Sequence, residues 1–263
     1  MNPSPSTENP SPSSGPDARP LLILLHGTRM NTGQWATYPA MLDDVAEVLA
    51  PDLAGHGQRE GEPFSVAQTL DDVNGLIDER PGRPVILGGY SMGGYLALHY
   101  AEHYPDRLSG LVLIGAATEP GGLKSWICRR VADAWEGVGL KGMKWIDRMG
   151  FAPICDPRLW RAIQQHGGQF RKIRHAWDDV MAGCSAQQLA ALDCPVLIMS
   201  GRIDPLHWQA ENFADATRQA QIISAPKRTH FWPLTRPDEV AQAMRGWLVK
   251  EVMARTSSTA ARG

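Results

Sequence analysis

A serine lies between glycines where an apolar run of the chain gives way to an amphipathic one. The residues Gly89, Ser91 and Gly93 make the pattern G-x-S-x-G, directly after the apolar run Val85–Tyr90. In this pattern the serine stands on a tight turn between a strand and a helix, with its hydroxyl presented as a nucleophile. Its neighbours must be small because the turn is strained and the helix packs closely on the strand. We therefore predict that Ser91 is a catalytic nucleophile.

A serine hydroxyl attacks well only when a base accepts its proton, and a neutral imidazole suits that role. Of the eight histidines, His230 follows the last predicted strand and precedes the last predicted helix. We predict that His230 is this base and that activity declines below about pH 6 to 7, around the ordinary histidine pKa. His26 is interpreted as a buried brace of its loop. His99 and His103 share a helix face but lack the glutamate of a zinc motif, so no metal site is expected.

The imidazole needs a carboxylate that holds its tautomer and stabilises its charged form. Asp204 is the candidate acid because it closely follows the predicted strand at residues 196–200. The chain order Ser91, Asp204, His230 is that of one known triad architecture. Glu119, just past another predicted strand, competes for this role, whereas Asp52 is interpreted as a brace of its own loop.

Attack on a carbonyl produces an oxyanion, which two backbone N–H groups can stabilise. Met92 is expected to supply one of them, because it begins the helix after Ser91, where N–H groups lack helical partners and the dipole is positive. Thr28 is expected to supply the other, from the loop after the first predicted strand.

These residues need a scaffold that brings distant loops together, and the apolar pattern of the chain predicts one. Short apolar runs alternate with amphipathic segments, which is typical of a parallel sheet covered by helices on both faces. The predicted fold class is therefore α/β, with a doubly wound, mainly parallel sheet. We predict strands over residues 21–25, 45–50, 85–90, 111–115, 196–200 and 221–224, and helices over residues 34–47, 66–79, 92–104, 208–219 and 237–253.

Residues 119–185 interrupt this alternation. They hold five of the nine tryptophans, and their eleven Lys and Arg exceed their seven Asp and Glu. We interpret the segment as a helical insertion over the sheet, between core segments 20–118 and 186–253. Aromatic side chains usually serve packing, but ligands of such sheets bind at the carboxyl ends of the strands, which the insertion would cover. The residues expected to contact substrate are Arg29, Trp126, Trp135, Trp145 and Trp232.

Composition excludes several classes of function. The chain has 263 residues, 43% apolar and 21% charged, which suffices for a sizeable core. A net charge of -2 gives no general attraction to nucleic acids or anionic membranes, and the longest apolar stretch, Leu21–Leu25, is too short to cross a bilayer.

Residues 1–19 are rich in Pro and Ser and residues 254–263 are small and polar, so both are expected to be flexible. No secretory signal is recognised, so reduced cysteines and a cytoplasmic location are expected.

Several landmarks together resemble the α/β-hydrolase superfamily, in particular its capped serine hydrolases. They are LLHGT, DLAGHG, GGYSMGGYLALHYAEHYPDRLSGLVLIG, PVLIMSGRIDP and THFWPLTRPDEV, spread over residues 21–250. The resemblance implies the same roles for Ser91, Asp204 and His230, the same two oxyanion amides, and a cap at residues 119–185. It implies no cofactor and no metal. Superfamily members usually have an antiparallel pair of strands before the first parallel one, where this chain has only the Pro- and Ser-rich arm.

The resemblance to carboxylesterase-like members implies hydrolysis of a carboxylic ester, thioester or lactone through an acyl-enzyme on Ser91. The tryptophan-rich, net-basic insertion favours a small apolar or aromatic substrate. Two alternatives stay open: cleavage of a carbon–carbon bond or formation of a peracid by the same three residues, and a ligand receptor with slow turnover or none. The expected partner is a small-molecule ester, and the sequence leaves the oligomeric state open.

Overall fold

The computed structural model describes residues 19–121, 130, 133, 137–138, 142, 145–167 and 173–254, and for residues 173–175 it describes the backbone alone. Within this part, six strands form one sheet in the order β2-β1-β3-β4-β5-β6, and each neighbouring pair is parallel. The predicted α/β fold class is confirmed. The strands are β1 (Leu21–Leu25), β2 (Glu47–Leu49), β3 (Val85–Tyr90), β4 (Gly110–Ile114), β5 (Val196–Gly201) and β6 (Ala220–Ala225).

The direction of winding reverses between β1 and β3. From β1 the chain passes to β2 at one edge, and then returns to add β3 and the later strands on the other side of β1. At such a reversal the loops leaving two adjacent strands separate, and ligands of open α/β sheets bind in the resulting crevice. Thr28 lies in the loop after β1, and Ser91 lies directly after β3.

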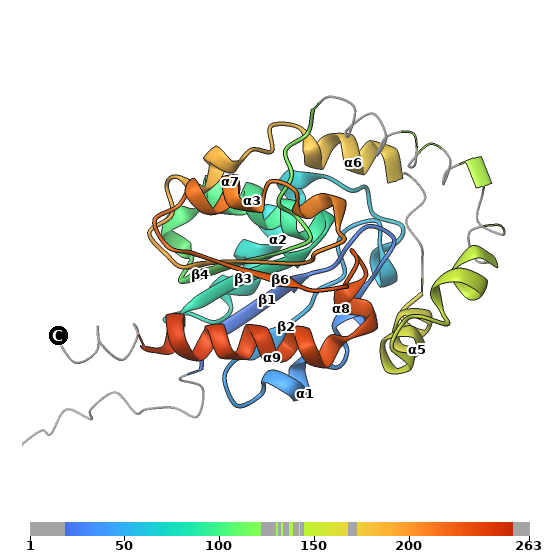
Figure 1. Ribbon diagram of the computed structural model, residues 1–263, viewed down its shortest axis with the longest axis horizontal. Helices are drawn as coiled ribbons and strands as arrows, with labels where there is room; N and C mark the ends of the chain where they lie inside the picture. Colours follow the sequence, from blue (N-terminus) through green and yellow to red (C-terminus); the bar gives the residue numbers. More distant parts are fainter. Residues whose placement is uncertain are drawn as a thin grey trace, which may run out of the picture.

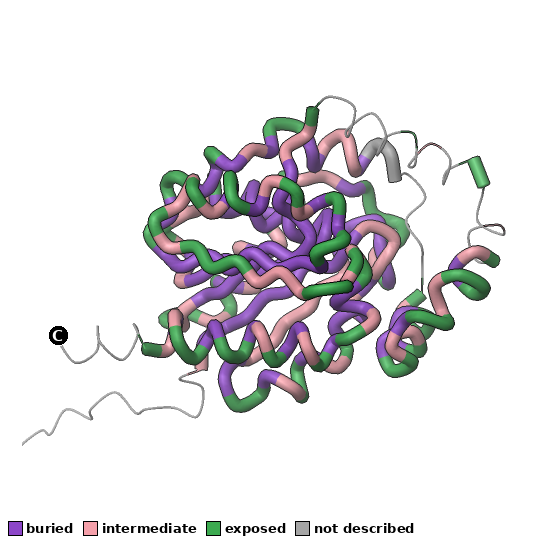
Figure 2. The backbone as a smooth tube through the Cα atoms, viewed as in Figure 1, coloured by how far each residue is buried: buried purple, intermediate pink, exposed green. Residues whose placement is uncertain are grey.

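Helices cover both faces of the sheet (Figure 1), and the four inner strands are buried between them (Figure 2). Strand β1 shows why: its five residues are apolar and buried, with Ile23 in one core and Leu22 and Leu24 in the other. The edge strands β2 and β6 are partly exposed. No helix in the described ranges combines the length and the apolar character of a membrane span. One face carries α2 (Val66–Asp78), α3 (Met92–His103) and α7 (Ala210–Asp215), and the other carries α1 (Tyr38–Leu42) and α9 (Pro237–Trp247).

Two predicted helices are wrong in extent. Over residues 34–47 the chain forms a 3-10 turn (Thr32–Trp35) and the short α1, and then runs directly into β2. Over residues 208–219 the helix α7 has six residues, and β6 already begins at Ala220. The apolar pattern reports which residues are buried, and here the short distance to the next strand decides where each helix ends.

The segment between β4 and β5 is docked on the loop that follows β1. A Cβ on Gly33 would lie 2.5 Å from the carbonyl carbon of Ala162, so only glycine permits this approach. The Asn31 side-chain amide donates to the Ile163 carbonyl oxygen at 2.9 Å. The predicted limits of the insertion, residues 119 and 185, stay a prediction. Its described elements are a π-helix (Asp147–Phe151), α5 (Pro157–Gln165) and α6 (Ile173–Met181).

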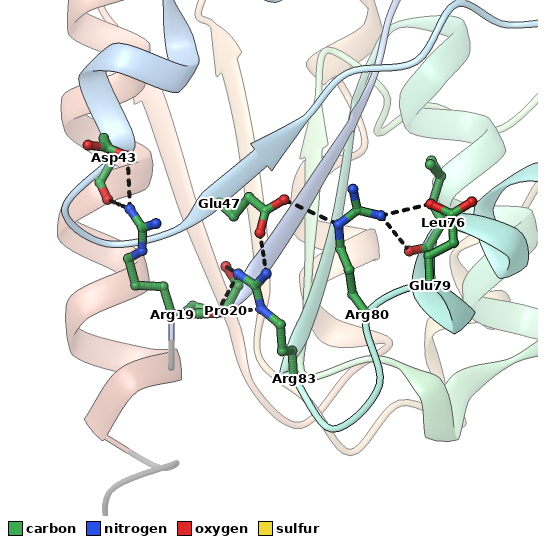
Figure 3. A network of polar contacts seen from close by, with 8 residues as sticks. All are labelled: Arg19, Pro20, Asp43, Glu47, Leu76, Glu79, Arg80 and Arg83. Atoms are coloured by element: carbon green, nitrogen blue, oxygen red, sulfur yellow. Dashed lines mark hydrogen bonds and ion pairs between the residues drawn. The ribbon is translucent and has the colours of Figure 1, made fainter. Parts of the chain in front are cut away.

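Ion pairs tie the amino ends of β1 and β2 to the turn before β3 (Figure 3). The Arg83 guanidinium donates to the Arg19 carbonyl oxygen at 2.9 and 2.7 Å and pairs with Glu47. Arg80 also pairs with Glu47, at 3.2 Å. Hydrogen bonds from Arg83 and then Arg80 lower the pKa of the Glu47 carboxyl, because they stabilise its charged form.

Candidate active site

Ser91 stands on a strained turn between β3 and α3. Its φ of 53° and ψ of -119° lie outside the regions that residues with side chains favour. The turn is possible because its neighbours lack side chains: a Cβ on Gly89 would lie 2.1 Å from the Gly93 carbonyl oxygen, and one on Gly93 would lie 2.3 Å from that of Leu25. The Ser91 N–H donates to the Ile114 carbonyl oxygen at 2.8 Å, which ties the turn to β4.

Three side chains from distant parts of the chain form a hydrogen-bonded line. The Ser91 Oγ lies 3.1 Å from the His230 Nε2, and the His230 Nδ1 lies 2.9 Å from the Asp204 Oδ2. These are the distances that let an imidazole take a proton from a hydroxyl while a carboxylate holds its other nitrogen. The structure thus brings together the three residues for which the sequence predicts catalytic roles.

The Asp204 carboxylate is held in place by the N–H group of Leu206, two residues further along the chain. Its Oδ1 accepts the Leu206 N–H at 2.8 Å, which leaves Oδ2 for His230, and its side chain is buried. The competing acid, Glu119, instead accepts the Ala186 N–H at 2.9 Å, at the end of the insertion. Asp52 accepts the N–H groups of Thr32 and Gln58 and braces its loop, as the sequence interpretation has it.

Gly115 is a site residue that the sequence reasoning missed. It follows β4 with a φ of +58°, and a Cβ there would lie 3.0 Å from both the Asp204 Oδ2 and the His230 Nδ1. A glycine at the end of a buried strand was the available signal. The Tyr90 ring also went unnoticed: its centroid is 4.9 Å from that of the His230 ring, so Tyr90 packs beside the imidazole.

The loop after β1 forms a tight turn in which the Met30 N–H donates to the Gly27 carbonyl oxygen at 3.1 Å. Arg29, at the third position, has a φ of 65°, as a type II turn requires. Within the described ranges, neither the Thr28 nor the Met92 N–H donates to another backbone group. The Thr28 Oγ1 is also buried without a hydrogen-bond partner in that part of the chain. Both N–H groups predicted for the oxyanion are thus available as donors.

Two other histidines, His26 and His56, are buried beside the turn after β1. The His26 Nε2 accepts the Leu53 N–H at 3.1 Å, and its Nδ1 lies 3.0 Å from the Gly27 carbonyl oxygen. Burial lowers the pKa of His26 to about 4, and burial together with the neighbouring His26 lowers that of His56 to about 3. Both rings are therefore neutral and structural at pH 7, as predicted for His26.

Of the residues predicted to contact substrate, the structure shows other contacts for two. Arg29 forms an ion pair with Asp147 at 2.6 Å, and the Trp232 indole N–H donates to Glu239 at 2.9 Å from within the core. Both side chains are therefore occupied by contacts within the fold. Trp145 is exposed and stays a prediction, and Trp126 and Trp135 lie outside the described residues.

Aromatic side chains that the sequence reasoning did not single out lie beside His230. The centroid of the Phe231 ring is 6.0 Å from that of His230 and 5.4 Å from that of Phe151, in the insertion. The Phe151 ring in turn packs against that of Trp160, at 5.7 Å. Phe231 is 39% exposed, which is unusual for a phenylalanine within a fold. An apolar surface therefore begins next to the imidazole.

No group of three or more potential ligands in the described ranges could hold a metal ion. The His99 ring is instead engaged within the fold: its Nε2 lies 2.7 Å from the Val180 carbonyl oxygen and 3.4 Å from the Cys184 Sγ. The His103 Nδ1 lies 2.9 Å from the His99 carbonyl oxygen. His99 therefore packs between α3 and the insertion, whereas His103 is exposed.

Comparison with known proteins gives consistent matches. The model of the alpha/beta hydrolase family matches residues 22–243. A solved thermophilic esterase from Thermogutta terrifontis, with malate bound, has 28% identity and a TM-score of 0.68 over 89% of this chain and 91% of that one. An (E)-2-((N-methylformamido)methylene)succinate hydrolase from Acinetobacter baylyi is 26% identical over 240 residues, 86% of this chain and 89% of that protein.

A shorter match has higher identity. A putative 2-succinyl-6-hydroxy-2,4-cyclohexadiene-1-carboxylate synthase from Bacillus subtilis is 35% identical over 111 residues, which are 41% of this chain. The match spans 39% of that relative's own length.

Proposed function

Because the chain belongs to the alpha/beta hydrolase family, we propose that it is a serine hydrolase that cleaves a carboxylic ester, thioester or lactone. The observation that carries the proposal is the hydrogen-bonded line from Ser91 through His230 to Asp204. The likeness to the Thermogutta terrifontis esterase supports ester chemistry.

In the proposed mechanism, the His230 Nε2 takes the proton of the Ser91 Oγ as that oxygen attacks the ester carbonyl. Asp204 stabilises the resulting imidazolium through the His230 Nδ1. The N–H groups of Thr28 and Met92 donate to the oxyanion of the tetrahedral intermediate. His230 then protonates the departing alcohol, and water releases the acid from the acyl-enzyme by the same steps.

We propose that the insertion at residues 119–185 acts as a cap over this site. Its docking on the loop after β1, through Gly33 and Asn31, supports that role. The rings of Phe231 and Phe151 beside His230 favour a small substrate with an apolar or aromatic group. Transfer of such a group from water to this apolar surface is favourable.

The test is a panel of chromogenic esters, from acetyl to long-chain and aryl, assayed with the parent protein and with Ser91→Ala. We expect turnover by the parent and a loss of at least about 1000-fold in the variant. A fluorophosphonate that labels the parent at Ser91 checks the nucleophile independently. Labelling without ester turnover would favour the carbon–carbon hydrolase, and neither labelling nor turnover would favour a receptor.

A further inference from the structure

The turn that carries Thr28 is held from the core side by two hydrogen bonds. The Gln34 side-chain oxygen accepts the Gly27 N–H at 3.0 Å, and Asp52 accepts the Thr32 N–H at 2.7 Å. These bonds fix the two ends of the loop, before Thr28 and after Met30. They do not reach the peptide units on either side of Arg29.

The middle of this turn is held from the other side, by the insertion. One terminal nitrogen of the Arg29 guanidinium lies 2.7 and 2.6 Å from the two carboxylate oxygens of Asp147. The side chains are 14% and 12% exposed, so both charges are largely removed from water. Removal of one partner would leave a poorly solvated charge, which makes such a pair a strong local constraint.

The backbone of Arg29 needs that constraint. With a φ of 65°, Arg29 has the left-handed conformation that residues with side chains rarely adopt. Such a conformation persists only where the surroundings hold it. A change of φ at Arg29 would rotate the Thr28–Arg29 peptide and shift the Met30 N–H away from the Gly27 carbonyl oxygen. That carbonyl belongs to the same peptide unit as the Thr28 N–H, so the direction of this N–H depends on the conformation of Arg29.

We propose that Arg29 and Asp147 are positioning residues that hold the Thr28 N–H in line with the oxyanion. The insertion then completes the site, because its π-helix supplies the carboxylate that locks the turn. This inference rests on the proposed ester hydrolysis through Ser91. Asp147 then affects the reaction through the conformation of the turn, and it does not contact the substrate.

The test compares Asp147→Asn, Arg29→Met, the double variant and Asp147→Glu in steady-state hydrolysis of a small acetyl ester. We expect kcat to fall about 10- to 100-fold with KM changed less than about 3-fold, because a misaligned donor weakens transition-state binding. The double variant should lose no more than either single one, since both remove the same contact. Asp147→Glu, which keeps the charge, should restore part of kcat.

Asp238→Asn is the matched control, since it removes another ion pair between the insertion and the core, from Arg158 to Asp238 at 3.1 Å. Its kcat should stay within about 2-fold of the parent. An unchanged kcat in Asp147→Asn, a rise in KM alone, or additive losses in the double variant would overturn the inference. If Asp147→Asn does not fold, Arg29→Met is judged by the same criteria.

The parent protein separates the two proposals. A parent that neither hydrolyses esters nor reacts with a fluorophosphonate overturns the proposed function, and this inference with it. A parent that does both, while Asp147→Asn matches its kcat, overturns this inference alone.

Discussion

The carboxyl ends of the strands carry strained backbone as well as ion pairs, whereas the amino ends carry ion pairs without such strain at residues other than glycine. Within the described ranges, the residues other than glycine with positive φ are Arg29, Ser91 and Lys227, and each follows the carboxyl end of a strand. At the amino ends, Arg83 and Arg80 converge on Glu47 (Figure 3). The carboxyl ends thus hold residues in unfavourable backbone conformations, and the amino ends have ion pairs that stabilise the sheet.

The difference has a physical basis. A nucleophile and its oxyanion donors must point at one spot, and the tight turns that aim them require unfavourable φ angles. The amino edge has no such demand, so its side chains can adopt the geometry that pairs charges best. We therefore expect substitutions at the carboxyl ends of the strands to lower activity. Substitutions at the amino ends should lower stability alone.

The largest effect is expected for Asp204→Asn. Asparagine can still accept the Leu206 N–H, but it no longer stabilises the charged imidazole or selects its tautomer. We expect kcat to fall about 10⁴-fold with little change in melting temperature, as in the general serine triad. Glu119→Gln is the control, and its kcat should stay within a few-fold of the parent. A large loss in that control would instead favour Glu119 as the acid.

A methyl group at Gly115 should come next. In Gly115→Ala the new Cβ would approach the Asp204 Oδ2 and the His230 Nδ1 to 3.0 Å, so the pair must separate. We expect kcat to fall about 10-fold, because a contact of 3.0 Å is relieved by a shift of a few tenths of an ångström, whereas misplacement by about 1 Å costs about 100-fold. Gly82→Ala, before β3, has a similar φ of +77° with nothing within 4 Å, so it should lose stability but keep kcat. Equal losses of kcat in both variants would contradict the contrast between the edges.

At the amino edge, Arg83→Met should lower stability without changing activity. The substitution removes the hydrogen bonds to the Arg19 carbonyl oxygen and the ion pair with Glu47. We expect the free energy of unfolding in guanidinium to fall by about 2 kcal/mol, the usual value for bonds to charged groups. Arg245→Met, which breaks an exposed pair with Asp44, should cost less than about 1 kcal/mol. A changed kcat in Arg83→Met would show that the edges are coupled.

The smallest effect is a difference in pH dependence. His26 and His56 have pKa values lowered by burial to about 4 and about 3, so the unfolded chain binds more protons below its ordinary histidine pKa near 6.5. Stability should therefore decline as the pH falls from 7.5 to 6, by about 1 kcal/mol for each of the two histidines. His26→Gln should flatten this decline when unfolding is followed at both pH values.

Glu47 should act in a lower pH range. The pKa of its carboxyl is lowered in the folded state, so its contribution is complete above the ordinary value of 4.5 and is lost as the pH falls through the folded value. Glu47→Gln should therefore change the stability profile below about pH 4.5 and leave the range from 7.5 to 6 unchanged. An altered slope in that upper range would contradict the assignment to the histidines.

The sequence by itself determined the strands, and it predicted the hydrogen-bonded approach of Ser91 to His230. An apolar run such as Leu21–Leu25 predicts a strand because the strands of a covered sheet are buried on both faces. The apolar character of each residue can be read without knowledge of the fold. The signal at Ser91 is equally local, since the tight turn there requires glycine at two nearby positions, Gly89 and Gly93. The chain order of Ser91, Asp204 and His230 then favoured one arrangement of the three.

Only the tertiary structure decided contacts between residues that no pattern connects. The pair of Arg29 with Asp147, the approach of Gly115 to Asp204, and the bond of Glu119 to Ala186 each depend on where two loops meet. The position of a loop follows from the packing of whole elements, to which many residues contribute weakly. For that reason the sequence does not distinguish an exposed arginine from an arginine in an ion pair. Only the fold does.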